Sequence, residues 1–397
     1  MKNRIGIFTN GIIWFGVAIS VSEIEAGIQI ASASPANSLW IPLILGHLLG
    51  GILLFFIGLI GAKLQMNAME TTKTAFGRYG SKFFAALNVM QLIAWVAVLN
   101  AQGALALVNL NLPISFQITC IILAVLVALW VYIGLERSSK LTTGVMTVLI
   151  ALLVVLSVKL FLANSPVQAA AISGISKPLS FWNIFEISIA MPISWLPVIS
   201  DYTRDVEKPV KATAVSTVAY TIASLWMYFI GIGVVGIGTN NVAHAILVMG
   251  LGTPGVIILV LSTVTTNFLA TNSAGESAKS IYTRLDAKIV GVIVSAISII
   301  IAISGIMTHY IDFLYLISSV FAPMAAVLLV SFYFDDNHDD GRGVWKWNMF
   351  AWFAGFIVYQ IGGFYDSIIF GPTLMSIIVS ASLAYAQVVF GKISEND

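Results

Sequence analysis

The chain has 397 residues, of which 59% are hydrophobic and only 9% are charged, and its formal net charge is +1. Soluble domains carry roughly 25% charged residues, so the composition excludes a water-soluble globular protein and indicates a protein of the lipid bilayer. A single cysteine, Cys120, excludes a disulfide framework. The apolar stretch after the N-terminal MKNRIGIFTNG lacks a persuasive cleavage pattern, so it is interpreted as a helix and not as a signal peptide.

A membrane-spanning helix needs about 20 mainly apolar residues, and the sequence contains twelve such candidates. Lipid offers the backbone no hydrogen-bond partners, so a spanning segment must be helical or belong to a closed barrel, and the alternating pattern of barrel strands is absent. We therefore expect an all-α integral membrane protein with 12 transmembrane helices. In chain order they are residues 5–31, 38–62, 82–108, 113–135, 142–163, 180–200, 210–237, 246–274, 286–308, 311–334, 347–363 and 367–391.

The basic residues predict how these helices are oriented. If the N-terminus is cytoplasmic, every lysine and arginine except Lys159 and Lys177 falls in an inside loop, as the positive-inside rule requires. One missed or invented helix would scramble this alternation, so it also supports the helix count. We expect a multi-pass protein of the cell (inner or plasma) membrane with both termini in the cytoplasm.

The absence of certain motifs narrows the class of membrane protein. The chain has no nucleotide-binding loop, dinucleotide fingerprint or Cys/His metal cluster, so we expect neither an ATP-driven motor, a resident cofactor nor a nucleic-acid partner. The acidic DDNHDDGR at 335–342 is interpreted as a solvated turn between the tenth and eleventh helices. A secondary transporter, a channel or a membrane enzyme remains.

Two of the predicted helices contain features that interrupt a helix. Secondary transporters often consist of two inverted repeats, each with a discontinuous helix near mid-membrane. The first helix contains FGVAISVSEIEAG at 15–27, and the sixth contains AMPISWLP at 190–197, whose prolines remove backbone donors. The alternative is that these residues only kink two ordinary helices. Because the two segments are five helices apart, we expect one transport domain over 1–397, with repeats at 5–163 and 180–334 and two additional helices at 347–391.

Polar side chains within predicted spans are costly and mark candidate sites. Glu23 lies close to the expected break in the first helix, whereas Glu25 and Glu186 lie nearer the outer surface and are expected to be hydrated. Gln91 and Trp95 are four residues apart in the third helix and share one face. An indole and an amide suit a planar heterocycle, because one can stack and the other can hydrogen-bond, but packing between helices would explain this pair equally well.

The eighth helix contains STVTTNFLATNS at 262–273, which is too polar to face lipid. The hydroxyl groups of Thr265 and Thr266 can bind a hard monovalent cation together with carbonyl groups freed in the first helix. Hydroxyl-rich packing between helices is the competing explanation. His47 in the second helix is interpreted as a packed, hydrogen-bonded histidine.

One segment carries a family resemblance. WLPVISDYTR at 195–204 resembles the end of the sixth helix in the nucleobase–cation symporter family of cytosine permease, allantoin and hydantoin transporters. WVAV at 95–98, TTN at 265–267 and the twelve predicted helices extend this resemblance over nearly the whole chain. The short length and the form MPISWLP…SDYTR look like the branch assigned to hydroxymethylpyrimidine, the pyrimidine precursor of thiamine.

The resemblance implies a leucine-transporter-type fold, with a five-plus-five inverted repeat and two C-terminal helices. Substrate would lie between helices one, three, six and eight, and sodium would usually drive transport. Trp95 would stack on the ring, while Thr265 and Thr266 would bind sodium with the carbonyls of Gly16 and Ile19. Ser262 falls where cytosine permease has a substrate-binding asparagine.

The sequence also departs from the family pattern. Pro192 replaces the aromatic residue that sandwiches the base from helix six, and Trp195 is the nearest aromatic side chain that can take over that role. Gln91 is offset by one position from the glutamine of cytosine permease, and Glu23 replaces a small residue. These departures favour a related ring that is not cytosine.

These residues suggest how an aminopyrimidine would be held. Glu23 would accept a hydrogen bond from the amine, and Gln91 or Asn267 would satisfy a ring nitrogen or a hydroxymethyl group. Such a polar site rejects analogues that leave its groups unpaired. The predicted substrate-binding set is completed by the other lining candidates of helices three, six and eight, namely Trp95, Pro192, Ser194, Trp195 and Ser262.

We therefore expect a secondary active cation symporter that imports a pyrimidine-type heterocycle, with hydroxymethylpyrimidine as the best candidate. A cytosine, purine or other nucleobase permease is the alternative, and an amino-acid transporter of the same fold is a further rival. An ion channel would need a filter-like repeat, which the sequence lacks. Sodium is the expected coupling ion, with protons carried by Glu23 as the alternative. The sequence leaves the oligomeric state open and is compatible with a monomer.

Overall fold

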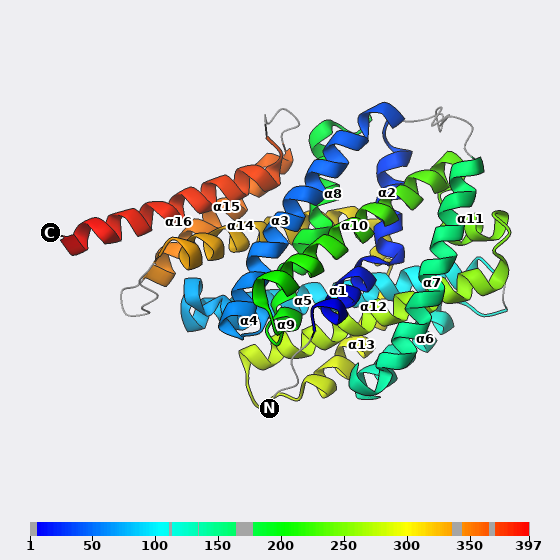
Figure 1. The fold of residues 1–397 in the computed structure, drawn as a ribbon, viewed down its shortest axis with the longest axis horizontal. Coiled ribbons are helices and arrows are strands. Elements are labelled where there is room, and N and C mark those ends of the chain that lie inside the picture. The colour runs from blue at the N-terminus through cyan, green and yellow to red at the C-terminus, as the bar shows by residue number, and fades with distance from the viewer. Residues whose placement is uncertain are drawn as a thin grey trace.

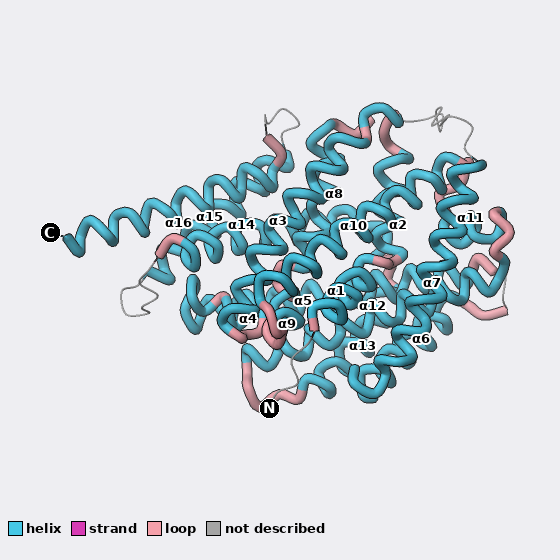
Figure 2. The backbone as a smooth tube through the Cα atoms, in the orientation of Figure 1, coloured by secondary structure: helices cyan, strands magenta, loops and turns pink. Residues whose placement is uncertain are grey.

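The computed structural model describes residues 6–110, 113–133, 135–163, 178–335, 344–364 and 370–396. Within these ranges the elements are helices, and no strand occurs (Figures 1 and 2). Each of the twelve predicted segments contains at least one helix, so the all-α expectation is confirmed. The acidic turn at 335–342 lies outside the described residues except for Asp335.

The helices that form the two predicted repeats begin with α1 (Ile7–Ala18) and α2 (Val21–Ser32). The first predicted repeat continues with α3 (Trp40–Leu64), α4 (Ala68–Thr71), α5 (Lys73–Val108), α6 (Phe116–Ile133) and α7 (Leu135–Ala163). The second contains α8 (Phe181–Trp195), α9 (Ile199–Thr203), α10 (Pro209–Gly236), α11 (Val242–Val248), α12 (Gly252–Ile281), α13 (Ala287–Ile303) and α14 (Tyr310–Tyr333). The two additional helices are α15 (Val344–Phe364) and α16 (Pro372–Asn396).

The number of membrane spans is only partly fixed by these helices. Among the described residues, eight helices are long and apolar enough to cross a bilayer, and the bent pair of α1 and α2 makes a ninth. Two of the remaining predicted spans fall short by length, since α8 has 15 residues and α13 has 17. The count of twelve and the cytoplasmic position of both termini therefore stay predictions.

The first predicted helix is broken, as expected, at Ile19 and Ser20. The two halves, α1 and α2, meet at an angle of 47°. Ser20 has an extended backbone and its hydroxyl group accepts a hydrogen bond from the Glu23 N–H at 3.4 Å, so it acts as the N-cap of α2. A capping serine therefore builds the break, while Gly16 lies inside α1.

The sixth predicted helix is also interrupted, but one turn later than its first proline suggests. α8 continues through Pro192 to Trp195, and the chain re-enters a helix, α9, at Ile199. Pro197 lies in the interruption, where its missing N–H costs least. The ring of Pro192 occupies the space above Gly50 of α3, where a Cβ atom would lie only 2.2 Å from the proline Cγ.

Most of the helices pack into two groups. We call α1, α2, α3, α8, α9 and α10 the first bundle, and α5, α6, α12 and α13 the second bundle, because each helix packs mainly on others of its own group. α14 contacts both bundles. α15 and α16 pair with each other beside α14 and extend away from the rest of the molecule (Figure 1, orange to red).

Within the first bundle, α2 and α10 approach until their backbones touch. A Cβ atom on Gly231 would lie 2.2 Å from the carbonyl oxygen of Ile24, and one on Gly27 would lie 2.5 Å from that of Tyr228. Small residues at such crossings let membrane helices pack closely. This contact holds the start of α2, including Glu23, directly against α10.

We expect Gly231→Val to destabilise the protein, because the added side chain must push α2 away from α10. Overpacking of this kind costs about 1–3 kcal/mol. The measurement is the melting temperature of the purified protein in detergent. Gly363→Val is the matched control, since a Cβ atom there meets nothing within 4 Å; equal melting temperatures for the two variants would contradict the prediction.

Candidate functional site

A pocket lies between the two bundles, next to both helix breaks. Its empty volume is about 380 Å³ with open solvent included, but the free space within it is only about 20 Å³, which is room for about one water molecule. The pocket must therefore widen to admit an aromatic ring. The first bundle contributes Val17, Ser20, Ser22, Glu23, Met191, Ser194 and Trp195 to its walls, and the second contributes Leu92, Trp95, Leu99, Thr266 and Ala270.

Glu23 forms the acidic part of the pocket wall. Its side chain is 2% exposed, and both carboxylate oxygens accept hydrogen bonds from hydroxyl groups of α10. Tyr220 donates to Oε1 at 2.9 Å and Ser224 donates to Oε2 at 2.8 Å. Each oxygen retains acceptor capacity for a ligand in the pocket.

Each bundle contributes one indole to the pocket. Trp95 belongs to α5 and packs edge-on against Phe313 and Tyr310 of α14, at ring-centroid distances of 5.3 and 6.3 Å. Trp195 ends α8 and packs edge-on against Trp14, with a centroid distance of 5.9 Å. These edge contacts fix the orientation of both rings and bring two stacking groups to one pocket.

Gln91 supports the pocket from behind and is not part of its lining. Its amide nitrogen donates to the Asn88 side-chain oxygen at 2.9 Å and to the Ser194 carbonyl at 3.0 Å. Asn88 in turn donates to the Pro197 carbonyl at 2.9 Å and to the Ser277 hydroxyl at 2.8 Å. The two amides thus satisfy carbonyl groups at the interruption of the sixth helix.

Two other predicted substrate residues with described side chains, Pro192 and Asn267, are not among those that line the pocket. Pro192 faces α3, as described above, and Asn267 donates to the Val96 carbonyl at 3.3 Å. The side chain of Ser262 lies outside the described residues. The Oδ1 atom of Asn267 is buried and has no hydrogen-bond partner among the described residues, so it can still accept from a ligand after a small movement of the helix.

The four predicted sodium ligands lie where the end of α1 passes α12, and Met146 packs against two of them. The Gly16 carbonyl accepts from the Ile19 N–H at 3.2 Å. The Thr265 hydroxyl donates to the Met146 sulfur at 3.8 Å, and the Met146 methyl group also lies over Gly16. Hard cations prefer oxygen to thioether sulfur, so Met146 would have to move before sodium could bind between these residues.

Thr266 fits a ligand role better. Its side chain is 3% exposed and lines the pocket, and its hydroxyl oxygen has no hydrogen-bond partner in the described part of the chain. A buried hydroxyl group without a partner is costly, so it is a candidate contact for an ion or a substrate. Of the four predicted ligands, it is the one whose side chain reaches the pocket.

The structure adds polar groups that the sequence did not single out. The Ser22 hydroxyl donates to the Gln102 side-chain oxygen, and Tyr310 donates to the Ser22 carbonyl at 2.9 Å. These bonds join α2 of the first bundle to α5 and α14 on one side of the pocket. Gln102 lies seven residues after Trp95, on the same helical face, and that spacing is the signal that could have identified it.

Glu186 corrects one expectation. It was expected to be hydrated, but it is 3% exposed and accepts hydrogen bonds from Thr373 and Tyr359. Its carboxylate therefore joins α8 to the pair of C-terminal helices. Glu186 is remote from the pocket lining, and its role in the described structure is to hold α15 and α16 in place.

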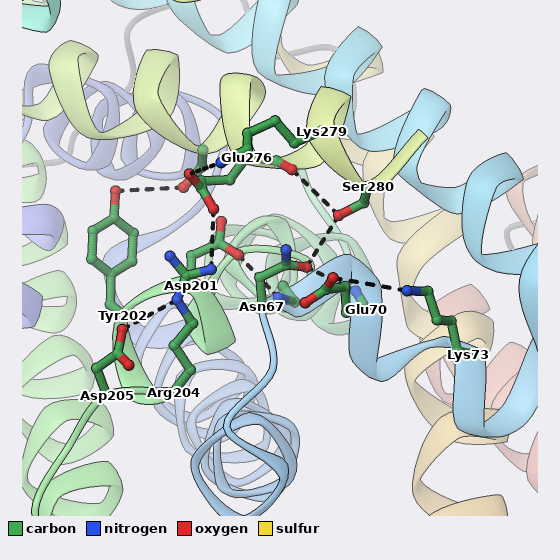
Figure 3. A network of polar contacts seen from close by, with 12 residues as sticks. Asn67, Glu70, Lys73, Asp201, Tyr202, Arg204, Asp205, Glu276, Lys279 and Ser280 are labelled. Atoms are coloured by element: carbon green, nitrogen blue, oxygen red, sulfur yellow. Dashed lines mark hydrogen bonds and ion pairs between the residues drawn. The ribbon is translucent and has the colours of Figure 1, made fainter. Parts of the chain in front are cut away.

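On the opposite side of the pocket, α9 and the residues after it connect the two bundles (Figure 3). Arg204 forms an ion pair with Glu276 of α12, with a distance of 3.0 Å between Nη1 and Oε2. Tyr202 donates to the Leu269 carbonyl of the same helix at 3.1 Å. Asp201 accepts from the N–H of Ala68 at 2.9 Å.

The remaining polar side chains of this segment contact the first bundle. Ser200 and Thr203 donate to the carbonyl groups of Ile57 and Gly58 of α3, at 3.3 and 2.8 Å. Every polar side chain of SDYTR therefore tethers the end of the sixth helix to a neighbouring segment. The SDYTR half of the WLPVISDYTR motif is thus structural, and none of residues 200–204 lines the pocket.

Comparisons with known proteins fit this architecture. Residues 2–339 match the family described as "Permease for cytosine/purines, uracil, thiamine, allantoin". The chain is 22% identical to the cytosine permease of Escherichia coli (strain K12) over 332 residues, which cover 83% of this chain and 78% of that protein.

Solved structures show the same fold. The inward-facing conformation of Mhp1 superimposes with a TM-score of 0.78 at 19% identity, covering 98% of this chain and 92% of that one. Mhp1 in a closed conformation with bromovinylhydantoin bound, described as a nucleobase-cation-symport-1 family transporter, gives 0.77 at 19% identity, with 97% and 91% covered. A Na+-coupled sialic acid symporter gives 0.62 at 14% identity, with 97% of each chain covered. The expected leucine-transporter-type fold is confirmed.

We expect the Arg204–Glu276 ion pair to contribute measurably to stability, because its side chains are only 25% and 18% exposed. A double-mutant cycle with Arg204→Gln and Glu276→Gln should give a coupling free energy of about 1 kcal/mol. Thermal unfolding of the purified variants provides the measurement.

The Glu70–Lys73 pair is the matched control, since it lies in the same network, is 39% and 46% exposed, and joins neighbouring residues at 3.8 Å (Figure 3). Exposed pairs contribute about 0–1 kcal/mol, so this second cycle should give a value near zero. Equal coupling in the two cycles would show that Arg204 and Glu276 do not hold the bundles together.

Proposed function

Because the chain belongs to the family of permeases for cytosine, purines, uracil, thiamine and allantoin, we propose that it is a cation symporter that imports a pyrimidine-type heterocycle. It is a multi-pass membrane transporter and not an enzyme. The observation that carries the proposal is the pocket at the two helix breaks, where an indole from each bundle accompanies a buried carboxylate. We place the protein in the cell membrane with both termini in the cytoplasm.

Hydroxymethylpyrimidine is the proposed substrate, because its groups complement those of the pocket. Its flat ring suits Trp95 and Trp195, and its amine can donate to the free acceptor positions of Glu23. The unpartnered hydroxyl group of Thr266 can bond to a ring nitrogen or to the hydroxymethyl group. Cytosine or another nucleobase is the second candidate, supported by the similarity to cytosine permease.

We propose that transport follows from movement of one bundle against the other. The pocket walls belong to different bundles, so their separation opens the pocket and their approach encloses the ring. The two proposed repeats, residues 5–163 and 180–334, would supply this movement around the broken helices. The coupling cation is either sodium, held by Gly16, Ile19, Thr265 and Thr266 after Met146 has moved, or a proton.

Uptake into proteoliposomes tests the proposal. Purified protein would be supplied with radiolabelled hydroxymethylpyrimidine, cytosine, uracil or leucine, each with and without an imposed cation gradient. We expect accumulation of hydroxymethylpyrimidine that unlabelled cytosine inhibits weakly and leucine does not inhibit. Accumulation of leucine, or transport that no cation gradient drives, would contradict the proposal.

We expect Trp95→Ala to raise the KM for the heterocycle by about 5- to 150-fold, because an aromatic ring stacked on a base contributes about 1–3 kcal/mol. The measurement is initial uptake rate against substrate concentration. Met90→Ala is the control, since Met90 lies on the same helix and is 65% exposed. An unchanged KM in Trp95→Ala would remove this residue from the binding site.

A further inference from the structure

A chain of hydrogen bonds leads from the pocket into the first bundle. It starts at Glu23, whose Oε2 atom lies 2.8 Å from the Ser224 hydroxyl, and continues from that hydroxyl to His47 Nε2 at 2.8 Å. On the far side of the imidazole, Nδ1 lies 2.6 Å from the Ser188 hydroxyl and 3.1 Å from the Leu43 carbonyl. Glu23 is 2% exposed and the other three side chains are fully buried.

Among the described residues, no basic side chain balances the acidic group of this hydrogen-bond chain. Among the described residues, neither a lysine nor an arginine is paired with Glu23. An ionised carboxylate buried without a cation is strongly disfavoured. The titratable groups nearest to it are His47, the hydroxyl groups of three tyrosines and one carboxylate on its own helix, namely Tyr220, Tyr228, Tyr310 and Glu25.

The other helices packed against α2 do not change this balance. α8 carries Glu186, whose oxygens are bonded to Tyr359 and Thr373. α11 carries His244, which is exposed. α5 contributes the neutral Gln102. Glu23 and His47 are therefore the two groups of this hydrogen-bonded series between which a proton can move through Ser224.

The far end of the chain fixes the proton on Nδ1 of His47. The Leu43 carbonyl can only accept hydrogen bonds, and two groups lie within reach of it, His47 Nδ1 and the Ser188 hydroxyl at 2.6 Å. Both contacts are satisfied when both groups donate. The imidazole therefore carries a proton on Nδ1, an assignment made from the donors and acceptors around it.

Ser224 then determines how many protons Glu23, Ser224 and His47 hold together. Its single hydroxyl proton can be donated either to Glu23 or to His47 Nε2, so the other group must donate to Ser224. Two arrangements meet this condition: a protonated Glu23 with a neutral His47, or an ionised Glu23 with an imidazolium. Both contain one proton more than an ionised Glu23 beside a neutral His47, which leaves one of the two Ser224 contacts without a donor.

The two arrangements interconvert without loss or gain of atoms. Glu23 passes its Oε2 proton to the Ser224 oxygen while Ser224 passes its own proton to His47 Nε2, and the reverse step restores the first arrangement. The observed spacing of 2.8 Å on each side of Ser224 suits both. The chain thus provides a site for one proton, shared between two groups and reached from the pocket through Glu23.

We propose that this site binds the proton whose gradient drives uptake, so that Glu23 loads and releases the coupling proton and His47 stabilises it through Ser224. The inference rests on the proposed function and names its coupling ion. Binding of a flat ring displaces the pocket water that would hydrate an ionised Glu23. Ring binding and proton binding therefore favour each other, which is the thermodynamic condition for symport.

Proteoliposomes containing the full chain test the proposal with radiolabelled hydroxymethylpyrimidine as the probe. We expect an acid-outside pH gradient without sodium to drive at least 10-fold accumulation, and a sodium gradient at equal pH to drive none. Adding substrate to unenergised vesicles should alkalinise the medium by about one proton per molecule taken up. Accumulation driven by sodium with no pH response would overturn the proposal.

Glu23→Gln separates coupling from binding. The glutamine side-chain oxygen can still accept from the substrate, so exchange of external for internal substrate should continue at a tenth or more of the wild-type rate. Accumulation under a pH gradient should fall to the equilibrium level. Continued accumulation, or loss of exchange together with accumulation, would overturn the coupling role, the latter because it would make Glu23 only a substrate ligand.

Two further variants complete the test. Ser224→Ala interrupts the path to His47 and should reduce accumulation by 3-fold or more while exchange continues, whereas unchanged accumulation would remove His47 from the site. Glu25 accepts a hydrogen bond from Gln29 of its own helix. Glu25→Gln is therefore the control, and it should accumulate substrate as the wild type does. If the wild type carries no heterocycle under any gradient, the proposed function itself fails, and that outcome is distinct from failure of Glu23→Gln alone.

Discussion

The pocket depends on how the two broken helices satisfy their backbone groups in a medium that supplies no water. A helix interrupted in a bilayer leaves carbonyl and N–H groups without partners, and each such group costs several kcal/mol unless protein replaces the missing bonds. At the sixth helix, Asn88 and Gln91 of α5 accomplish this by donating to the carbonyls of Pro197 and Ser194. At the first helix, the Ser20 hydroxyl caps α2. The second bundle therefore supplies hydrogen bonds to the broken sixth helix and also forms one wall of the pocket.

This constraint explains why the most distinctive sequence and the substrate chemistry lie in different places. The polar residues of SDYTR hold the end of the sixth helix against α3, α4 and α12, and such contacts are needed whichever ring is carried. The lining residues Met191, Ser194 and Trp195 precede the interruption, and they are free to differ between transporters of one fold. Within this short segment, the residues that line the pocket can therefore change without changing the residues that hold the fold.

The sequence predicts the helical segments and both breaks because apolar length and helix-breaking residues are local properties. It also indicates Glu23 as a site candidate beside a predicted break, and the family resemblance indicates Trp95; both line the pocket. It does not predict which way an amide points: Gln91 supports the wall because the Ser194 carbonyl lies within its reach, and no local pattern states that distance.

Partners from distant helices are the other part that the sequence leaves undetermined. Pro192 is tolerated within α8 because Gly50 of α3 leaves room for its ring, so the break moves to Pro197. Glu186 is buried because Tyr359 and Thr373 come from helices more than 170 residues away. His47 was interpreted as a packed, hydrogen-bonded histidine, and its bonds confirm this. Its connection to Glu23, however, runs through Ser224, on a face of α10 where Ser216, Tyr220, Ser224 and Tyr228 recur every four residues.

The contacts on the two sides of the pocket are of one physical kind. Ser22 and Gln102 join the bundles on one side, and Arg204 and Glu276 join them on the other, with free space for about one water molecule between. All four side chains are polar, so in the proposed movement each pair would become hydrated as its side of the pocket opens and would lose little free energy, because water replaces the lost bonds. Apolar side chains in these positions would expose their surface to water at about 25 cal/mol per Å². Polar contacts on both sides of the pocket would therefore keep the open and closed forms close in free energy, as a transporter that alternates between the two forms needs.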